Sequence, residues 1–134
     1  MANFTMERHQ SLPAVIVSYT PEFSAHDEIV ANVEAITQIL DQQTAPVFLI
    51  SDASSVKNIS IQDLIETINF IARGGNTLMD HPMLDLVIVV TTGEVVKMSV
   101  EGMKSPLFGS RRVRVASTLE EALAVVAEES VHTD

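Results

Sequence analysis

The chain has 134 residues, a length that suits one domain with a single core. Eight Lys and Arg against 18 Asp and Glu give a formal charge of −10, which argues against nucleic acid and anionic membrane surfaces as partners. The chain contains no cysteine, which excludes disulfides and thiolate metal sites, and it has no apolar run long enough for a membrane span, so we expect a cytoplasmic protein.

The first third of the chain predicts a β-hairpin followed by a helix. Residues 4–9 and 13–20 are typical of strands, and the segment Ser11-Leu12-Pro13 supplies the turn between them. Within residues 24–43, apolar side chains recur at steps of four, three and four, at Ile29, Val33, Ile36 and Leu40. This spacing is the apolar stripe of a helix that lies on a sheet.

The remaining sequence alternates strands with helices. Strands are expected at 45–51, 84–92 and 111–117, and helices at about 60–73, 93–105 and 118–129. The run at 84–92 is the most hydrophobic strand, which predicts a place at the centre of the sheet. Strands that alternate with helices pair in parallel through right-handed crossovers.

The fold class expected from this order is α/β, with one domain over residues 1–134. Its sheet is mixed and mostly parallel with an N-terminal antiparallel hairpin, and about four helices pack on it. The core covers about residues 3–129, and the tail at 130–134 is expected to fray.

A hydroxyl residue lies near the start of each expected helix, with an acid three positions later: Ser24 with Asp27, Ser60 with Asp63, Thr91 with Glu94, and Thr118 with Glu121. Such a pair predicts a capping box, in which the hydroxyl and the acid each accept a backbone N–H. We therefore interpret Ser60, Thr91 and Thr118 first as helix caps.

Hydroxyl groups and one acid gather where the expected strands end, and ligands of open parallel sheets bind at this edge. The candidate partner- or ligand-binding residues are Tyr19, Asp52, Ser54, Ser55, Ser60, Thr91 and Thr92. These groups can hydrogen-bond a ligand, but they include no base beyond Asp52 and no cation to stabilise an anion. We expect no catalytic residue and no cofactor.

The histidines give no sign of a metal site, because His9, His26, His81 and His132 lack the spacing of metal ligands. The segment Asp80-His81-Pro82 is typical of a turn. A receiver-like domain or an enzyme that uses Asp52 is the least favoured alternative. Receivers need an acidic pair that holds magnesium and a lysine, and this chain has SYTP and VAST in those places.

The central segment VFLISDASSVKNISIQDLIETI resembles the STAS domain and its SpoIIAA-like relatives. Residues 52–56, Asp-Ala-Ser-Ser-Val, match the family's strand-end Asp and the short segment after it, and RVRVASTLEEALAVV is similar to its last strand and helix. The family's next helix opens with an Asp followed by a phosphorylated Ser. Here Ser60 stands in place of that Asp and Ile61 in place of the Ser. The phosphoswitch therefore does not carry over.

The resemblance implies a non-enzymatic regulatory module that acts through protein contacts, with the loop from Asp52 to Ser60 as the contact surface and with self-association to a homodimer as one form of contact. The alternative is a domain of the same fold that binds or carries a small molecule or a lipid.

Overall fold

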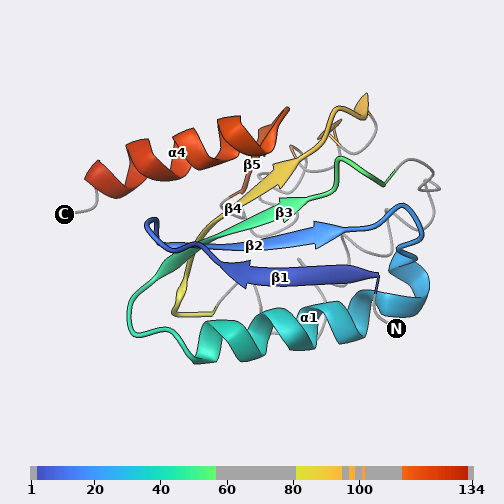
Figure 1. Ribbon diagram of the computed structural model, residues 1–134, viewed down its shortest axis with the longest axis horizontal. Coiled ribbons are helices and arrows are strands. Elements are labelled where there is room, and N and C mark those ends of the chain that lie inside the picture. Colours follow the sequence, from blue (N-terminus) through green and yellow to red (C-terminus); the bar gives the residue numbers. More distant parts are fainter. Residues whose placement is uncertain (1–2, 57–80, 95–96, 99–100, 102–112, 133–134) are drawn as a thin grey trace.

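A computed structural model of the protein describes residues 3–56, 81–94, 97–98, 101 and 113–132. Within these residues the chain forms five strands and two helices, arranged as one sheet with a helix on each side (Figure 1). This arrangement confirms the α/β class.

The strands form one sheet in the order in which they occur in the chain. They are β1 (Phe4–Arg8), β2 (Ala14–Tyr19), β3 (Val47–Asp52), β4 (Leu84–Val90) and β5 (Val113–Ala116). β1 pairs antiparallel with β2, and the other neighbours pair in parallel. The expected N-terminal hairpin and the mostly parallel sheet are therefore confirmed.

The expectation that the run at 84–92 is the central strand is wrong. β3 is the middle strand, and β4 lies between β3 and the edge strand β5. Hydrophobicity did not distinguish the two positions, because a strand next to a short edge strand is still covered on both faces. Ile88 of β4 is as fully buried as Ile50 of β3.

Two helices cover opposite faces of the sheet, α1 (Ala25–Asp41) and α4 (Leu119–His132) (Figure 1). The alternation of side chains along β2 divides the core, since Val15 and Val17 pack on the α1 side whereas Ala14 and Ile16 pack on the α4 side. The apolar stripe of α1, expected from its spacing, lies against the sheet, with Val33, Ile36 and Leu40 buried.

The described residues contain two helices, whereas about four are expected for the whole chain. The helix expected at 60–73 lies outside the described residues, and most of the one expected at 93–105 does too.

The C-terminal helix is longer than expected. α4 continues to His132, past Ser130, where the sequence predicts a frayed tail. The Ser130 hydroxyl donates to the Ala127 carbonyl at 3.1 Å, a bond within the last helical turns. In the part of the chain that the structure describes, no helix has the length and apolar character to cross a membrane.

Candidate functional site

The carboxyl ends of the parallel strands align at one edge of the sheet. Ser18 of β2 pairs with Asp52 of β3, Asp52 with Val90 of β4, and Val90 with Ala116 of β5. The residues that follow these strand ends therefore share one edge, as expected for an open parallel sheet.

Asp52 shapes the loop that leaves β3. Its Oδ1 accepts the backbone N–H of Ser54 at 3.1 Å and the Ser54 hydroxyl at 2.6 Å, an Asx turn in which the carboxylate replaces a backbone acceptor. The N–H of Val56 donates to the carbonyl of Ala53, closing a second turn, and the N–H of Ala53 donates to the carbonyl of Val90 on the neighbouring strand. We call residues 52–56 the recognition loop.

Within the recognition loop, Asp52 is half-buried, whereas Ser54 and Ser55 are exposed. The Ser54 hydroxyl is held by Asp52. Ser60, the last residue of the expected contact surface, lies outside the described residues.

Thr91 and Thr92 follow β4 at the same edge. Thr91 is buried, its N–H donates to the carbonyl of Ala116, and its Oγ1 accepts the N–H of Gly93 at 3.1 Å. Thr92 is exposed. The capping box expected from Thr91 and Glu94 is replaced by this shorter turn, since a Thr hydroxyl two residues before an N–H readily bonds it.

The side chain of Tyr19 lies under α1. Its hydroxyl donates to Oδ1 of Asn32 at 3.1 Å and also interacts with the Ser51 hydroxyl. Burial raises the pKa of the Tyr19 phenol, and the two hydrogen-bonding side chains oppose this only in part. The ring stacks edge-on against Phe23, with centroids 4.6 Å apart.

Tyr19 and the recognition loop belong to opposite sides of the sheet. Leu49 packs on the α1 side and Ile50 on the α4 side, so alternation puts Ser51 with Tyr19 and Asp52 on the other face. The sequence predicts that these residues lie together at one edge. In the structure they form two groups on opposite faces of the sheet: the recognition loop, and a cluster of Tyr19, Asn32 and Ser51 under α1, which we call the buried cluster.

Asn32 is the member of the buried cluster that sequence reasoning missed. It is 2% exposed, and its Nδ2 has no hydrogen-bond partner among the described residues. Its spacing in the sequence could have identified it as a buried polar residue. Asn32 lies three residues after Ile29 and four before Ile36, so it falls on the apolar stripe of α1.

The start of α1 differs from the expected capping box. Ser24 is the N-cap residue, but its side chain makes no cap hydrogen bond, and Glu28 takes the place of Asp27 as the acid. Glu28 accepts the N–H of Ser24 at 2.9 Å and both the backbone and side-chain N–H groups of Asn3. The Ser24 bond, followed by the Asn3 side chain, lowers the pKa of Glu28. Glu28 therefore joins the chain before β1 to α1.

The cap of α4 is close to the expected one. The Thr118 hydroxyl accepts the N–H of Glu121 at 3.1 Å, as in a capping box. The Glu121 carboxylate accepts the N–H of Ser117, one residue earlier than predicted.

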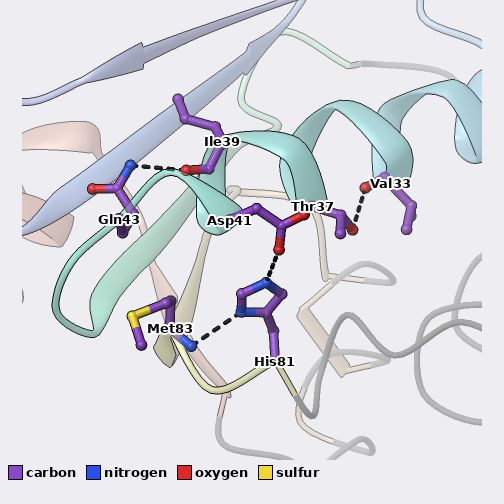
Figure 2. A network of polar contacts seen from close by, with 7 residues as sticks. All are labelled: Val33, Thr37, Ile39, Asp41, Gln43, His81 and Met83. Atoms are coloured by element: carbon purple, nitrogen blue, oxygen red, sulfur yellow. Dashed lines mark hydrogen bonds and ion pairs between the residues drawn. The ribbon is translucent and has the colours of Figure 1, made fainter.

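His81 lies in the local turn that the sequence predicts, and it also contacts Asp41, which is 40 residues away in the chain. Figure 2 shows its ring between the end of α1 and the start of β4, with Nε2 2.7 Å from Oδ1 of Asp41. Its Nδ1 accepts the backbone N–H of Met83 at 3.0 Å. Because Nδ1 is an acceptor, a neutral ring carries its proton on Nε2 and donates it to Asp41. This clamp lies at the amino ends of the parallel strands, away from the recognition loop.

Metal ligands do not gather in the part of the chain that the structure describes, where no group of three His, Asp or Glu side chains could hold an ion. Among the residues that the structure describes, the exposed polar ones that follow the parallel strands at the carboxyl edge include Ser54, Ser55, Thr92, Glu94, Ser117 and Thr118.

Comparison with known proteins gives a structural relative only. No protein-family model matches the chain, and no curated protein matches its sequence. The fold is similar to the crystal structure of an uncharacterized protein of the DUF3478 family from Shewanella loihica PV-4, described as having a SpoIIAA-like fold. The two chains are 12% identical, with a TM-score of 0.54 over 92% of this chain and 91% of the other. The chain therefore has a SpoIIAA-like fold.

Proposed function

We propose that the chain is a non-enzymatic regulatory module that binds another protein in the cytoplasm through its recognition loop and the adjacent Thr92. The observation that carries this proposal is the use of Asp52, whose Oδ1 accepts both hydrogen-bonding groups of Ser54. These two hydrogen bonds between Asp52 and Ser54 hold the recognition loop in one shape. A preformed loop binds with less loss of conformational entropy than a disordered one.

The chemistry of the loop favours a basic partner surface. The loop presents a carboxylate and two hydroxyls, Glu94, which follows Thr92 in the chain, is exposed, and the chain has a formal charge of −10. A partner that presents Lys or Arg would be steered to this edge, whereas a second copy of the same acidic chain would be repelled. We therefore favour a different protein over a homodimer.

A photo-crosslinking experiment tests the proposal. A photoreactive amino acid replaces the exposed Ser55 in one variant and the exposed Thr44, near the amino end of β3, in a matched control. After irradiation in cells, we expect one major crosslinked protein at position 55 and none of the same mass at position 44. Identical products at both positions would contradict the proposal, as would products at position 55 that contain only this chain.

A further inference from the structure

The buried cluster under α1 contains hydrogen-bonding capacity that the protein does not use. Asn32 is 2% exposed, and its Oδ1 is occupied by Tyr19. Its Nδ2, which carries two hydrogens, has no hydrogen-bond partner among the described residues. A buried amide donor without a partner gives up its hydrogen bonds to water and gains none in return, so such groups are uncommon in folded proteins.

A second unused group lies at the same strand end. The Oγ1 of Thr20, the residue after Tyr19, is buried and has no hydrogen-bond partner among the described residues. Because side chains alternate along β2 and the pairing continues to Thr20, this hydroxyl falls on the face opposite Tyr19 and is not part of the buried cluster.

The cluster is close to the surface of the molecule. Tyr19 and Ser51, whose side chains are hydrogen-bonded to each other, are each partly exposed. The Tyr19 hydroxyl also donates to the buried Asn32. Phe4 and Phe23 pack on the Tyr19 ring, with centroids 6.5 and 4.6 Å from it, and give this end of the sheet an aromatic wall. Aromatic rings therefore flank the cluster at its Tyr19 end.

The charge around the cluster restricts the occupant. Asn32 offers a neutral donor, and Glu28 precedes it by one turn on α1. Together with the formal charge of −10, this disfavours an anion such as a carboxylate or a phosphate. The group that suits the site is an uncharged oxygen acceptor on a small apolar body.

We infer that the cluster of Tyr19, Asn32 and Ser51 is a binding site for a small neutral molecule, whose carbonyl oxygen accepts a hydrogen bond from Nδ2 of Asn32. This site lies on the other face of the sheet from the recognition loop, and the inference does not depend on the proposed protein partner.

Three probes of similar shape test the site by NMR. Cyclohexanone carries the carbonyl, methylenecyclohexane lacks the oxygen, and cyclohexanecarboxylate is an anion. The readouts are the side-chain amide signals of Asn32 and the ring protons of Tyr19, which are unambiguous because the chain has one tyrosine. We expect cyclohexanone to shift both sets of signals saturably, with a dissociation constant on the order of 1 mM.

A pair of variants on α1 completes the test. Asn32→Leu removes the donor at similar size, and Gln38→Leu changes an exposed residue of the same helix. Binding of cyclohexanone should weaken at least tenfold in the first variant and stay unchanged in the second. If Asn32→Leu does not fold, the comparison of the three probes on the unaltered protein is sufficient to test whether the site recognises a neutral carbonyl group.

Three results would overturn the inference. The first is an absence of shifts with cyclohexanone up to its solubility limit. The second is an equal response to methylenecyclohexane, which would show that the carbonyl is not recognised. The third is a long-lived water molecule that stays at Nδ2 of Asn32 in the presence of every probe.

Discussion

Two carboxylates in this chain stabilise local structure by accepting N–H groups, in different ways. Asp52 accepts two groups of one residue, Ser54, and so shapes a turn. Glu28 accepts groups from Asn3 and Ser24 and so joins two segments of the chain. The sequence singles out Asp52 by its place at a strand end, whereas Glu28 depends on Asn3, which is 25 residues away and lies beyond the reach of a local pattern.

Replacement of Asp52 by Ala is expected to loosen the recognition loop and lower the free energy of unfolding by about 1 kcal/mol, because two hydrogen bonds to Ser54 are lost. Asp52→Asn is the matched control, since its side-chain oxygen can still accept from Ser54. Urea unfolding of both variants measures the difference. Equal losses in the two variants would show that the turn does not depend on the acceptor at Oδ1.

Tyr19 is expected to ionise at a higher pH in the folded protein than in the unfolded chain. Burial raises its pKa above the ordinary value of 10.0. A raised pKa means that this contribution to stability is complete below about pH 10 and is lost as the pH rises through the folded-state pKa. Tyrosinate absorbance, followed with and without urea, reports on Tyr19 alone because the chain has no other Tyr and no Trp. Coincident titration curves would contradict the burial of its hydroxyl.

At the scale of the elements, the helices are tied to the sheet by polar contacts near their ends. Glu28 joins the first turn of α1 to the chain before β1, and Asp41 at the end of α1 contacts His81 before β4. Arg114 of β5 pairs with Glu129 of α4 at 2.6 Å. Helix periodicity predicted where α1 lies on the sheet, but it did not predict these contacts because each joins distant parts of the chain.

Glu28→Gln is expected to lower the free energy of unfolding at neutral pH by about 0.5 kcal/mol, a small value because solvent screens the carboxylate. The pKa of Glu28 is lowered in the fold. Its contribution is therefore present above the pKa of an unfolded glutamate, about 4.3, and is lost as the pH falls through the folded-state value. Thermal unfolding from pH 7 to pH 3 should show the difference from the unaltered protein disappear. Glu34→Gln, an exposed change on the same helix, is the control and should leave that pH profile unchanged.

The clamp between His81 and Asp41 predicts a single tautomer of the histidine. Because Nδ1 accepts the N–H of Met83, nitrogen NMR should find the proton of the neutral ring on Nε2. Asp41→Ala should cost only about 0.5 kcal/mol, because the Asp41 side chain is 64% exposed. Gln42→Ala, at an exposed neighbouring position, should cost less. A proton on Nδ1 would contradict the clamp shown in Figure 2.

At the scale of the whole molecule, alternating strands and helices were enough to predict the fold class, since parallel strands joined by helices have few arrangements. The sequence did not identify the central strand, because the runs of β3 and β4 are both buried on two faces. It also grouped Tyr19 with Asp52, although they lie on opposite sides of the sheet. The face on which a strand's last residue lies depends on where that strand ends, and patterns fix strand ends only to within a few residues.

Salt dependence is the property of the whole molecule that separates recognition by charge from recognition by shape. If the acidic chain is steered to a basic partner, crosslinking at position 55 in a cell extract should fall by at least about tenfold between low salt and 1 M salt, where the Debye length shrinks to about 3 Å. A crosslink that persists at high salt would point to apolar packing as the main source of affinity. That result would leave the recognition loop as the contact but exclude a basic surface as its main determinant, because exposed charges at such an interface are screened by salt.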